Sequence, residues 1–167
     1  MLSRTVAVLI CVVCLSGWSL ASPKLEERRQ AQTAPLKPRT LTAADLQKLH
    51  WIEGCWRGTG GGVPTFYERY RFEGTTLLVD TIEDDKVKDT SRFELKNGEF
   101  GSGADPTRSV ATAFDEKSIT FANVGRAGSG WKWERVDANQ WRAVIFLPAT
   151  ANRAAGERIY TMDRIGK

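Results

Sequence analysis

The chain has 167 residues, of which 41% are hydrophobic and 10% aromatic. This is enough apolar material for one core and too short a chain for two ordinary domains, so we expect a single domain. The 24 basic and 20 acidic residues give a net charge of +4 and are interleaved along the chain. Nucleic-acid binding needs basic side chains gathered on one surface, so we expect no nucleic-acid partner. One histidine and three cysteines are too few for the usual zinc sites, and we expect no metal.

Residues 1–21 have the pattern of a secretory signal peptide. One charged residue, Arg4, precedes an apolar run from Val6 to Leu15, and the segment ends at Ala21 with small residues typical of a cleavage site. The apolar run is too short for a stop-transfer helix, so we expect no transmembrane segment in the mature chain. The protein is therefore predicted to be exported, either to the periplasm or out of the cell.

Residues 22–40 hold three of the six prolines and no aromatic residue. Such a segment cannot bury enough apolar surface to offset the entropy lost on ordering it, which predicts a disordered linker. Residues 41–167 then form the predicted folded domain.

Cleavage after residue 21 would remove Cys11 and Cys14 and leave Cys55 as the only thiol. Because Ile52 and Trp56 flank it, we expect Cys55 to be buried as a small apolar side chain. The alternative is a thiol available for pairing between two chains.

The folded domain begins with a helix signal. Thr42 followed three positions later by Asp45 forms a potential capping box, which predicts a short helix from about Ala43 to Leu49. From Trp51 onward, short alternating runs are separated by turn signals such as Asn97-Gly98. This spacing is typical of an antiparallel meander of about eight to ten strands. Closure removes exposed edges, so we predict an all-β, up-and-down antiparallel β-barrel with a short N-terminal helix.

Two hairpins allow the strand register to be predicted. A two-residue turn at Glu73-Gly74 would place Tyr70 opposite Leu77 and Glu68 opposite Val79, on an otherwise apolar face. The reverse face, with Tyr67, Arg69, Arg71 and Asp80, would meet water.

The second hairpin is expected to turn at Ala138-Asn139. Trp131 would then lie opposite Phe146, Trp133 opposite Val144, and Arg135 opposite Arg142. This register predicts an apolar interior with guanidinium groups at one end.

Several short motifs resemble known barrels. The run Trp51-Ile-Glu-Gly-Cys-Trp56-Arg-Gly58 resembles the opening of a secreted bacterial family of unknown function, and its G-x-W core looks like the first strand of calycin barrels such as lipocalins. The stretch from Gly58 to Thr65, followed by Tyr67-Glu68, is similar to the start of nitrobindin-like haem barrels. The resemblance implies a calycin-like barrel in which Trp56 lies under an arginine of the last strand, with Arg164 the candidate.

The last predicted strand, Glu157 to Ile165, gives two indications of which ligand the barrel could bind. Nitrobindin-like proteins bind haem through a histidine on this strand, and here it has none, so we expect no cofactor. Arg158-Ile-Tyr160 resembles the Arg-x-Tyr pair that holds a ligand carboxylate in fatty-acid-binding barrels. The resemblance thus implies a carboxylate-binding role for Arg158 and Tyr160.

Glu68 is the most informative single residue, because a carboxylate on an apolar face must be paired or have a raised pKa. It could be a ligand anchor or a catalytic acid or base. The alternatives are a structural ion pair with Arg158 or Arg142, or a register that turns it toward solvent. Arg142, Arg158 and Tyr160 could together bind an anionic head group, or could simply be outward-facing polar residues.

The sequence therefore favours an exported barrel that binds a small, apolar or amphipathic ligand with an acidic head group. The predicted ligand-binding residues are Glu68, Tyr70, Trp131, Trp133, Arg142, Arg158 and Tyr160. One alternative is a non-catalytic interaction module of the cell envelope with a filled barrel. A less favoured alternative is an enzyme that depends on Glu68; no catalytic residue is assigned, since no nucleophile motif is present.

Overall fold

A computed structural model describes residues 37–166 of the chain. The predicted signal peptide, residues 1–21, and most of the predicted linker, residues 22–40, lie outside the described residues. At the end of the linker, the backbone N–H of Arg39 donates to the carbonyl of Ala111 at 2.7 Å, and Thr40 forms an isolated bridge with Glu99. These bonds attach the chain to the barrel just before the helix that begins at Ala43.

A short helical segment opens the domain. In α2 (Ala43–Gln47), the Thr42 hydroxyl accepts from the Asp45 backbone and the Asp45 carboxylate accepts from the Thr42 backbone, which confirms the predicted capping box. The helix is shorter than expected because a 3-10 turn, η1 (His50–Ile52), follows it. The segment buries Leu46, Leu49 and Ile52. Within residues 37–166, the helices fall short of the length and apolar character needed to span a bilayer.

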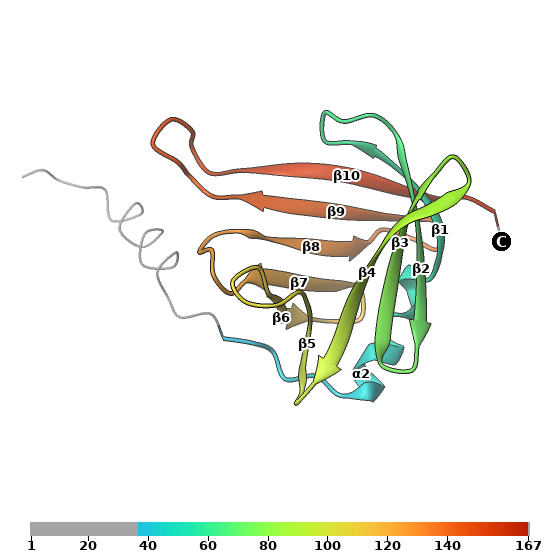
Figure 1. The fold of residues 1–167 in the computed structure, drawn as a ribbon, viewed down its shortest axis with the longest axis horizontal. Coiled ribbons are helices and arrows are strands. Elements are labelled where there is room, and N and C mark those ends of the chain that lie inside the picture. Colours follow the sequence, from blue (N-terminus) through green and yellow to red (C-terminus); the bar gives the residue numbers. More distant parts are fainter. Residues whose placement is uncertain (1–36, 167) are drawn as a thin grey trace, which may run out of the picture.

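Ten antiparallel strands form one closed sheet (Figure 1). Each strand pairs with the next along the chain, and β1 pairs with β10 to close the barrel. The predicted all-β, up-and-down barrel is therefore confirmed. The strands are β1 (Gly54–Gly60), β2 (Phe66–Glu73), β3 (Thr76–Glu83), β4 (Lys86–Lys96), β5 (Glu99–Ser102), β6 (Ser109–Phe114), β7 (Ser118–Asn123), β8 (Gly130–Arg135), β9 (Gln140–Leu147) and β10 (Gly156–Arg164).

Turn chemistry sets the hairpin lengths. Asn97 and Gly98 form the two-residue connection between β4 and β5, and both adopt positive φ, of 53° and 81°. This backbone suits the right-handed twist of paired strands, and Asn-Gly adopts it at little steric cost. The turn predicted here from the sequence is thus present.

The β2–β3 hairpin differs from its predicted register by two residues. Its turn is Gly74-Thr75 and not Glu73-Gly74, so Glu68 lies opposite Thr81 and Tyr70 opposite Val79. Gly74 takes the first turn position with a φ of 62°, which favours glycine. Because side chains alternate with a period of two, the shift changes the partners and leaves Glu68 and Tyr70 on the inner face.

The register of the β8–β9 hairpin differs from the predicted one by one residue, which reverses the side chains of β9 that face inward and outward. Trp133 lies opposite Ala143 and Trp131 opposite Ile145, so the register predicted around Ala138-Asn139 is wrong. Five residues, 136–140, lie between the paired Arg135 and Trp141, in place of the six expected between Arg135 and Arg142. The Asp137 carboxylate holds this turn by accepting from the Asn139 backbone at 2.7 Å. Three residues that we expected inside, Arg142, Val144 and Phe146, therefore alternate to the outer face.

One end of the barrel is closed by a stack that the calycin resemblance implied. The Arg164 guanidinium lies 4.1 Å from the centre of the Trp56 ring, and Trp56 is buried. Arg164 also donates to the carbonyls of Glu53 at 2.8 Å and Trp51 at 3.2 Å. The Trp56 indole in turn donates to the carbonyl of Ile52 at 2.7 Å. This network fixes the last strand and η1 to the first strand.

Two expectations about burial on the outer surface are wrong. Cys55 is exposed, because the alternation that turns Trp56 inward turns its neighbour outward. Asp80, expected to meet water, is 1% exposed beneath two arginines. Burial raises its pKa, but hydrogen bonds from Thr90, Arg69 and Arg71 outweigh that effect and leave the pKa below its usual value.

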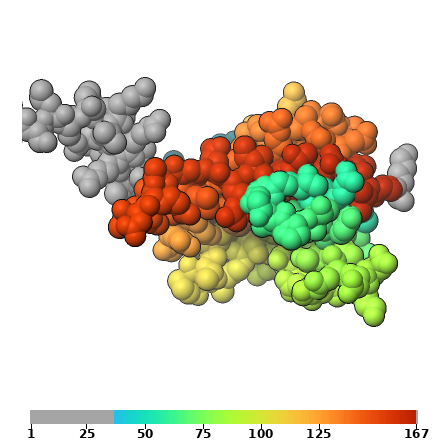
Figure 2. Space-filling model, turned by 90° about the horizontal axis from the view of Figure 1, so that it is seen from above, coloured from blue at the N-terminus to red at the C-terminus, as the bar shows by residue number. Residues whose placement is uncertain are grey.

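The loop between β1 and β2 lies beside β10. Figure 2 shows this loop covering one side of the body next to the last strand. The contact is close: a Cβ at Gly61 would stand 2.3 Å from the Tyr160 ring. Val63, Pro64 and Thr65 of this loop border the interior cavity.

Candidate functional site

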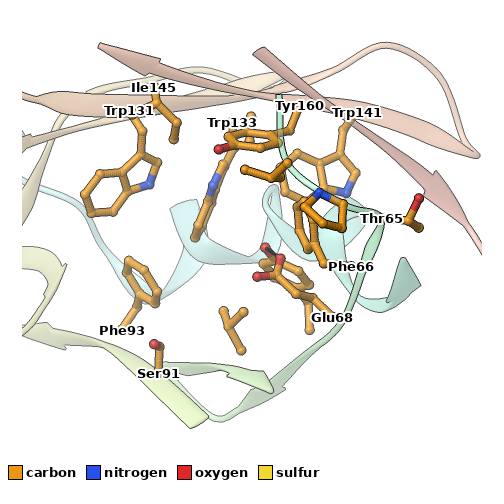
Figure 3. Close-up of a pocket in the computed structure, with 15 residues that line it drawn as sticks. Thr65, Phe66, Glu68, Ser91, Phe93, Trp131, Trp133, Trp141, Ile145 and Tyr160 are labelled. Carbon is orange, nitrogen blue, oxygen red and sulfur yellow. Dashed lines mark hydrogen bonds between the residues drawn. The ribbon is translucent and has the colours of Figure 1, made fainter. Parts of the chain in front are cut away.

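The interior of the barrel contains a cavity of about 640 Å³ (Figure 3). Its walls come from β2, β3, β4, β8, β9, β10 and the β1–β2 loop, so strands distant in sequence contribute to one space. In Figure 3, Glu68 points toward the centre, while Trp131, Trp133 and Tyr160 form the opposite wall. Ligand sites in proteins are commonly concave and apolar with a few polar groups, and this cavity has that character.

The structure brings together five of the seven predicted ligand-binding residues. Those that line the cavity are Glu68, Tyr70, Trp131, Trp133 and Tyr160. Their shared position follows from the alternation of β2, β8 and β10. Whether they bind a ligand stays a prediction.

The two predicted arginines do not line the cavity. Arg142 is exposed on the outer face of β9, opposite Glu134, because of the one-residue difference in the β8–β9 register. Arg158 alternates in phase with Tyr160, yet it is exposed and lies outside the lining. The predicted cluster of Arg142, Arg158 and Tyr160 is therefore not assembled.

Seven of the 15 residues that line the cavity are aromatic. Tyr70 lies edge-to-face with Trp133, with ring centres 5.8 Å apart, and Phe93 contacts Trp133 at 5.1 Å. At the loop end, Phe66 lies edge-to-face with Tyr160 at 5.6 Å. Such contacts hold the rings in fixed orientations around the cavity.

Glu68 is partly buried and takes its only side-chain hydrogen bond within the described residues from Tyr70. The Tyr70 hydroxyl donates to Glu68 Oε2 at 2.7 Å. Burial raises the pKa of Glu68, and the hydrogen bond from Tyr70 opposes this effect only in part. No salt bridge to Glu68 occurs in the described part of the chain, so neither of the predicted ion pairs with Arg158 or Arg142 forms there.

Tyr70 responds to the same environment. It is 4% exposed, and burial together with the adjacent Glu68 carboxylate raises its pKa well above the usual value. The phenol therefore stays protonated and acts as a hydrogen-bond donor at neutral pH. Sequence reasoning placed both residues on one face and missed the bond between them.

The sequence interpretation missed several lining residues. Trp141, Ala143 and Ile145 face inward on β9, and the correct register would have found them. Phe93 and Ser91 line the cavity from β4, whose preceding residues are mostly polar and exposed. Phe93 is the one large apolar residue near the middle of that strand, and this isolated apolar side chain could have indicated that it faces inward.

A second hollow, of about 820 Å³, adjoins the first. The two share Thr65, Phe66 and Glu68, so Glu68 lies where they meet. The second hollow extends under the β3–β4 hairpin, where its charged lining residues include Glu83, Asp84, Asp85 and Lys88. Glu68 therefore borders both the interior cavity and this outer hollow.

The described residues were also compared with what a metal site requires. No group of three or more metal-ligating side chains occurs in this range. Compared with models of known families and with curated proteins, the chain shows no match. The fold and the cavity define the class of the molecule as a closed ten-stranded β-barrel with an aromatic interior pocket.

Proposed function

We propose that the protein is an exported binding protein of the calycin-like type, which holds a small, largely apolar molecule inside its barrel. The observation that carries this proposal is the aromatic-walled cavity of about 640 Å³. Its volume falls within the range of about 300–1,000 Å³ that is common for small-molecule sites. An apolar ligand would displace water from these walls and gain the free energy of burying its surface.

The cavity also separates the proposal from the interaction-module alternative. A module that works only through its outer loops has no need of interior space, and close packing is the normal state of a protein interior. Here bulky residues surround the space without filling it. This supports a role for the interior over a role for the loops alone.

Export is the second part of the proposal. It is supported by the signal-peptide pattern of residues 1–21 and by the motifs that resemble a secreted bacterial family. The Trp56–Arg164 stack agrees with what the calycin resemblance implied. We therefore propose a periplasmic or secreted protein.

An enzyme that uses Glu68 is a second candidate function. Burial raises the pKa of this carboxyl, and Tyr70 positions it at 2.7 Å, a pairing found where proton transfer is catalysed. The binding proposal is favoured because the described residues that line the cavity include no histidine, cysteine or basic side chain to work with this pair.

Tryptophan fluorescence tests the binding proposal. The protein would be titrated with a panel of fatty acids and aromatic molecules, alongside Ala143→Phe, which fills the cavity, and Ala113→Phe, which adds the same ring at an exposed position of β6. Circular dichroism would establish that both variants fold.

We expect a saturable change in emission for the wild type and for Ala113→Phe, and weaker binding for Ala143→Phe. If no panel member changes the emission, or if Ala143→Phe binds as well as the wild type, binding inside the barrel is contradicted.

A further inference from the structure

The charge of the cavity wall points to the polar end of the ligand. Among the 15 described residues that line the cavity, Glu68 is the only Asp, Glu, Lys, Arg or His. A carboxylate in an apolar setting needs a compensating charge or hydrogen-bond donors. The protein supplies one donor, the Tyr70 hydroxyl to Oε2, and within the described residues Oε1 receives no hydrogen bond.

The position of Oε1 matters because it remains accessible. It is not among the buried polar atoms without a partner, which in the described chain are His50 Nε2, Trp51 Nε1 and Trp141 Nε1. A ligand in the cavity can therefore reach this oxygen. An anionic head group would instead meet a like charge with no basic side chain in the lining to compensate it.

The rings around Glu68 favour a cation as well. Tyr70 and Trp133 stand edge-to-face beside it, and Tyr160 lies across the cavity in Figure 3. The faces of aromatic rings carry partial negative charge and attract ammonium groups, most strongly where water is excluded. A carboxylate together with such rings is a suitable receptor for a protonated amine.

The outer hollow extends this charge pattern to the surface. Among its basic residues, Arg69 is bonded to Asp80 at 2.7 Å and Lys88 is paired with Glu83. Asp84 and Asp85 form no ion pair within residues 37–166, so the uncompensated groups of this hollow are carboxylates. The chain as a whole has a net charge of +4, and this region is an acidic exception. Such a region raises the local concentration of cations.

We propose that the ligand is an organic cation, an apolar or aromatic molecule with a basic nitrogen that pairs with Glu68. The proposal rests on the proposed function, since it assumes that the cavity is the binding site. It replaces the acidic head group expected from the sequence, because Arg142 and Arg158 do not line the cavity. The apolar body lies among Phe93, Trp131 and Trp133, and the nitrogen lies against Glu68 Oε1.

Three probes with one ring system test the charge preference. Isothermal titration calorimetry at neutral pH would compare 2-(2-naphthyl)ethylamine, 2-naphthylethanol and 2-naphthylacetate, which are cationic, neutral and anionic. Each would be titrated into the full-length mature protein, Glu68→Gln, and the control Glu134→Gln. Glu134 lies on the outer part of β8, outside the cavity lining, so the control makes the same chemical change away from the cavity.

We expect the wild type to bind the amine at least about tenfold more tightly than the acetate, in line with a partly desolvated charge pair. Glu68→Gln should weaken amine binding by about tenfold or more and leave the alcohol within about twofold, while Glu134→Gln matches the wild type. If the alcohol binds but the amine has no advantage, or keeps its advantage in Glu68→Gln, the cation proposal is overturned and cavity binding survives. If none of the three probes binds, both proposals fail.

Discussion

The contact between Arg164 and Trp56 should contribute a large share of the stability of this barrel. Replacing Arg164 by Met keeps a side chain of similar length over the ring and removes the guanidinium. Loss of the cation–π contact, at 4.1 Å, costs about 0.5–2 kcal/mol. The carbonyls of Trp51 and Glu53 also lose their hydrogen-bond donor. Leaving a carbonyl without a donor costs about 1–3 kcal/mol of stability if it is fully buried, and less where water can reach it. We therefore expect a loss of about 3 kcal/mol.

Equilibrium urea unfolding, followed by circular dichroism and tryptophan fluorescence, measures this loss. The slope of free energy against urea should stay the same and the midpoint should fall. Arg57→Met is the matched control, because Arg57 makes an exposed ion pair with Asp163 at 3.4 Å on the same pair of strands. It should change stability by about 0.5 kcal/mol or less. Equal losses for Arg164→Met and Arg57→Met would refute the reasoning.

Three further predictions concern pH, packing and exposure. Burial raises the pKa of Glu68, so the folded wild type loses stability as the pH rises through that pKa. Glu68→Gln lacks this titration, and its melting temperature should therefore rise relative to that of the wild type between about pH 4 and pH 8. A difference in melting temperature that stays constant with pH would argue against a raised pKa. Gly130→Ala would place a Cβ 2.2 Å from the carbonyl oxygen of Phe121, and should lower the urea midpoint by the equivalent of about 1–3 kcal/mol. The control Gly156→Ala adds a methyl group in open space and should leave the midpoint unchanged. Equal midpoints for the two variants would contradict the packing described. Cys55 is exposed, so a thiol reagent should modify it in the native protein nearly as fast as in urea, and strong protection would show that it is covered.

The barrel itself could be predicted from the sequence because alternation and turn residues are local signals. A capping box at Thr42 and Asp45, and Asn97-Gly98 between two strands, each specify their own short segment. Glu68 and Tyr70 were placed on the inner face even though the predicted turn was displaced. The displacement moved their partners by two residues, and a shift by two leaves every side chain on its own face.

The placement of Arg142 was wrong because a register shift of one residue, unlike a shift of two, reverses the face of every side chain on the strand. In the β8–β9 hairpin the difference is one residue, so Arg142 moves to the outer surface while Trp141 and Ile145 face the cavity. What decides the loop length is a set of particular hydrogen bonds, including Asn139 to the Asp137 carboxylate and Arg164 to the Asn139 carbonyl. The second of these depends on a strand far along the chain, which turn rules applied to a single hairpin cannot include.

Burial at the surface was also set by non-local contacts. Asp80 lies on the outer face as predicted from its register, yet Arg69, Arg71 and Thr90 from the two neighbouring strands cover it. Likewise, the spacing of two residues places Tyr70 and Glu68 on one face, but the hydrogen bond between them also depends on their rotamers within the cavity. The sequence thus indicated which residues face inward more reliably than which of them interact.

The most direct test of binding inside the barrel is a nitrogen–proton correlation spectrum of the tryptophan indole groups. It would be recorded for the mature protein with and without 2-(2-naphthyl)ethylamine, after assignment by single Trp→Phe substitutions. The account predicts that the indole signals of Trp131 and Trp133, which line the cavity, shift in a saturable way, while that of Trp56, bonded to the Ile52 carbonyl at 2.7 Å, stays in place. Shifts at Trp56 with none at Trp131 and Trp133, or no saturable shift at all, would contradict it.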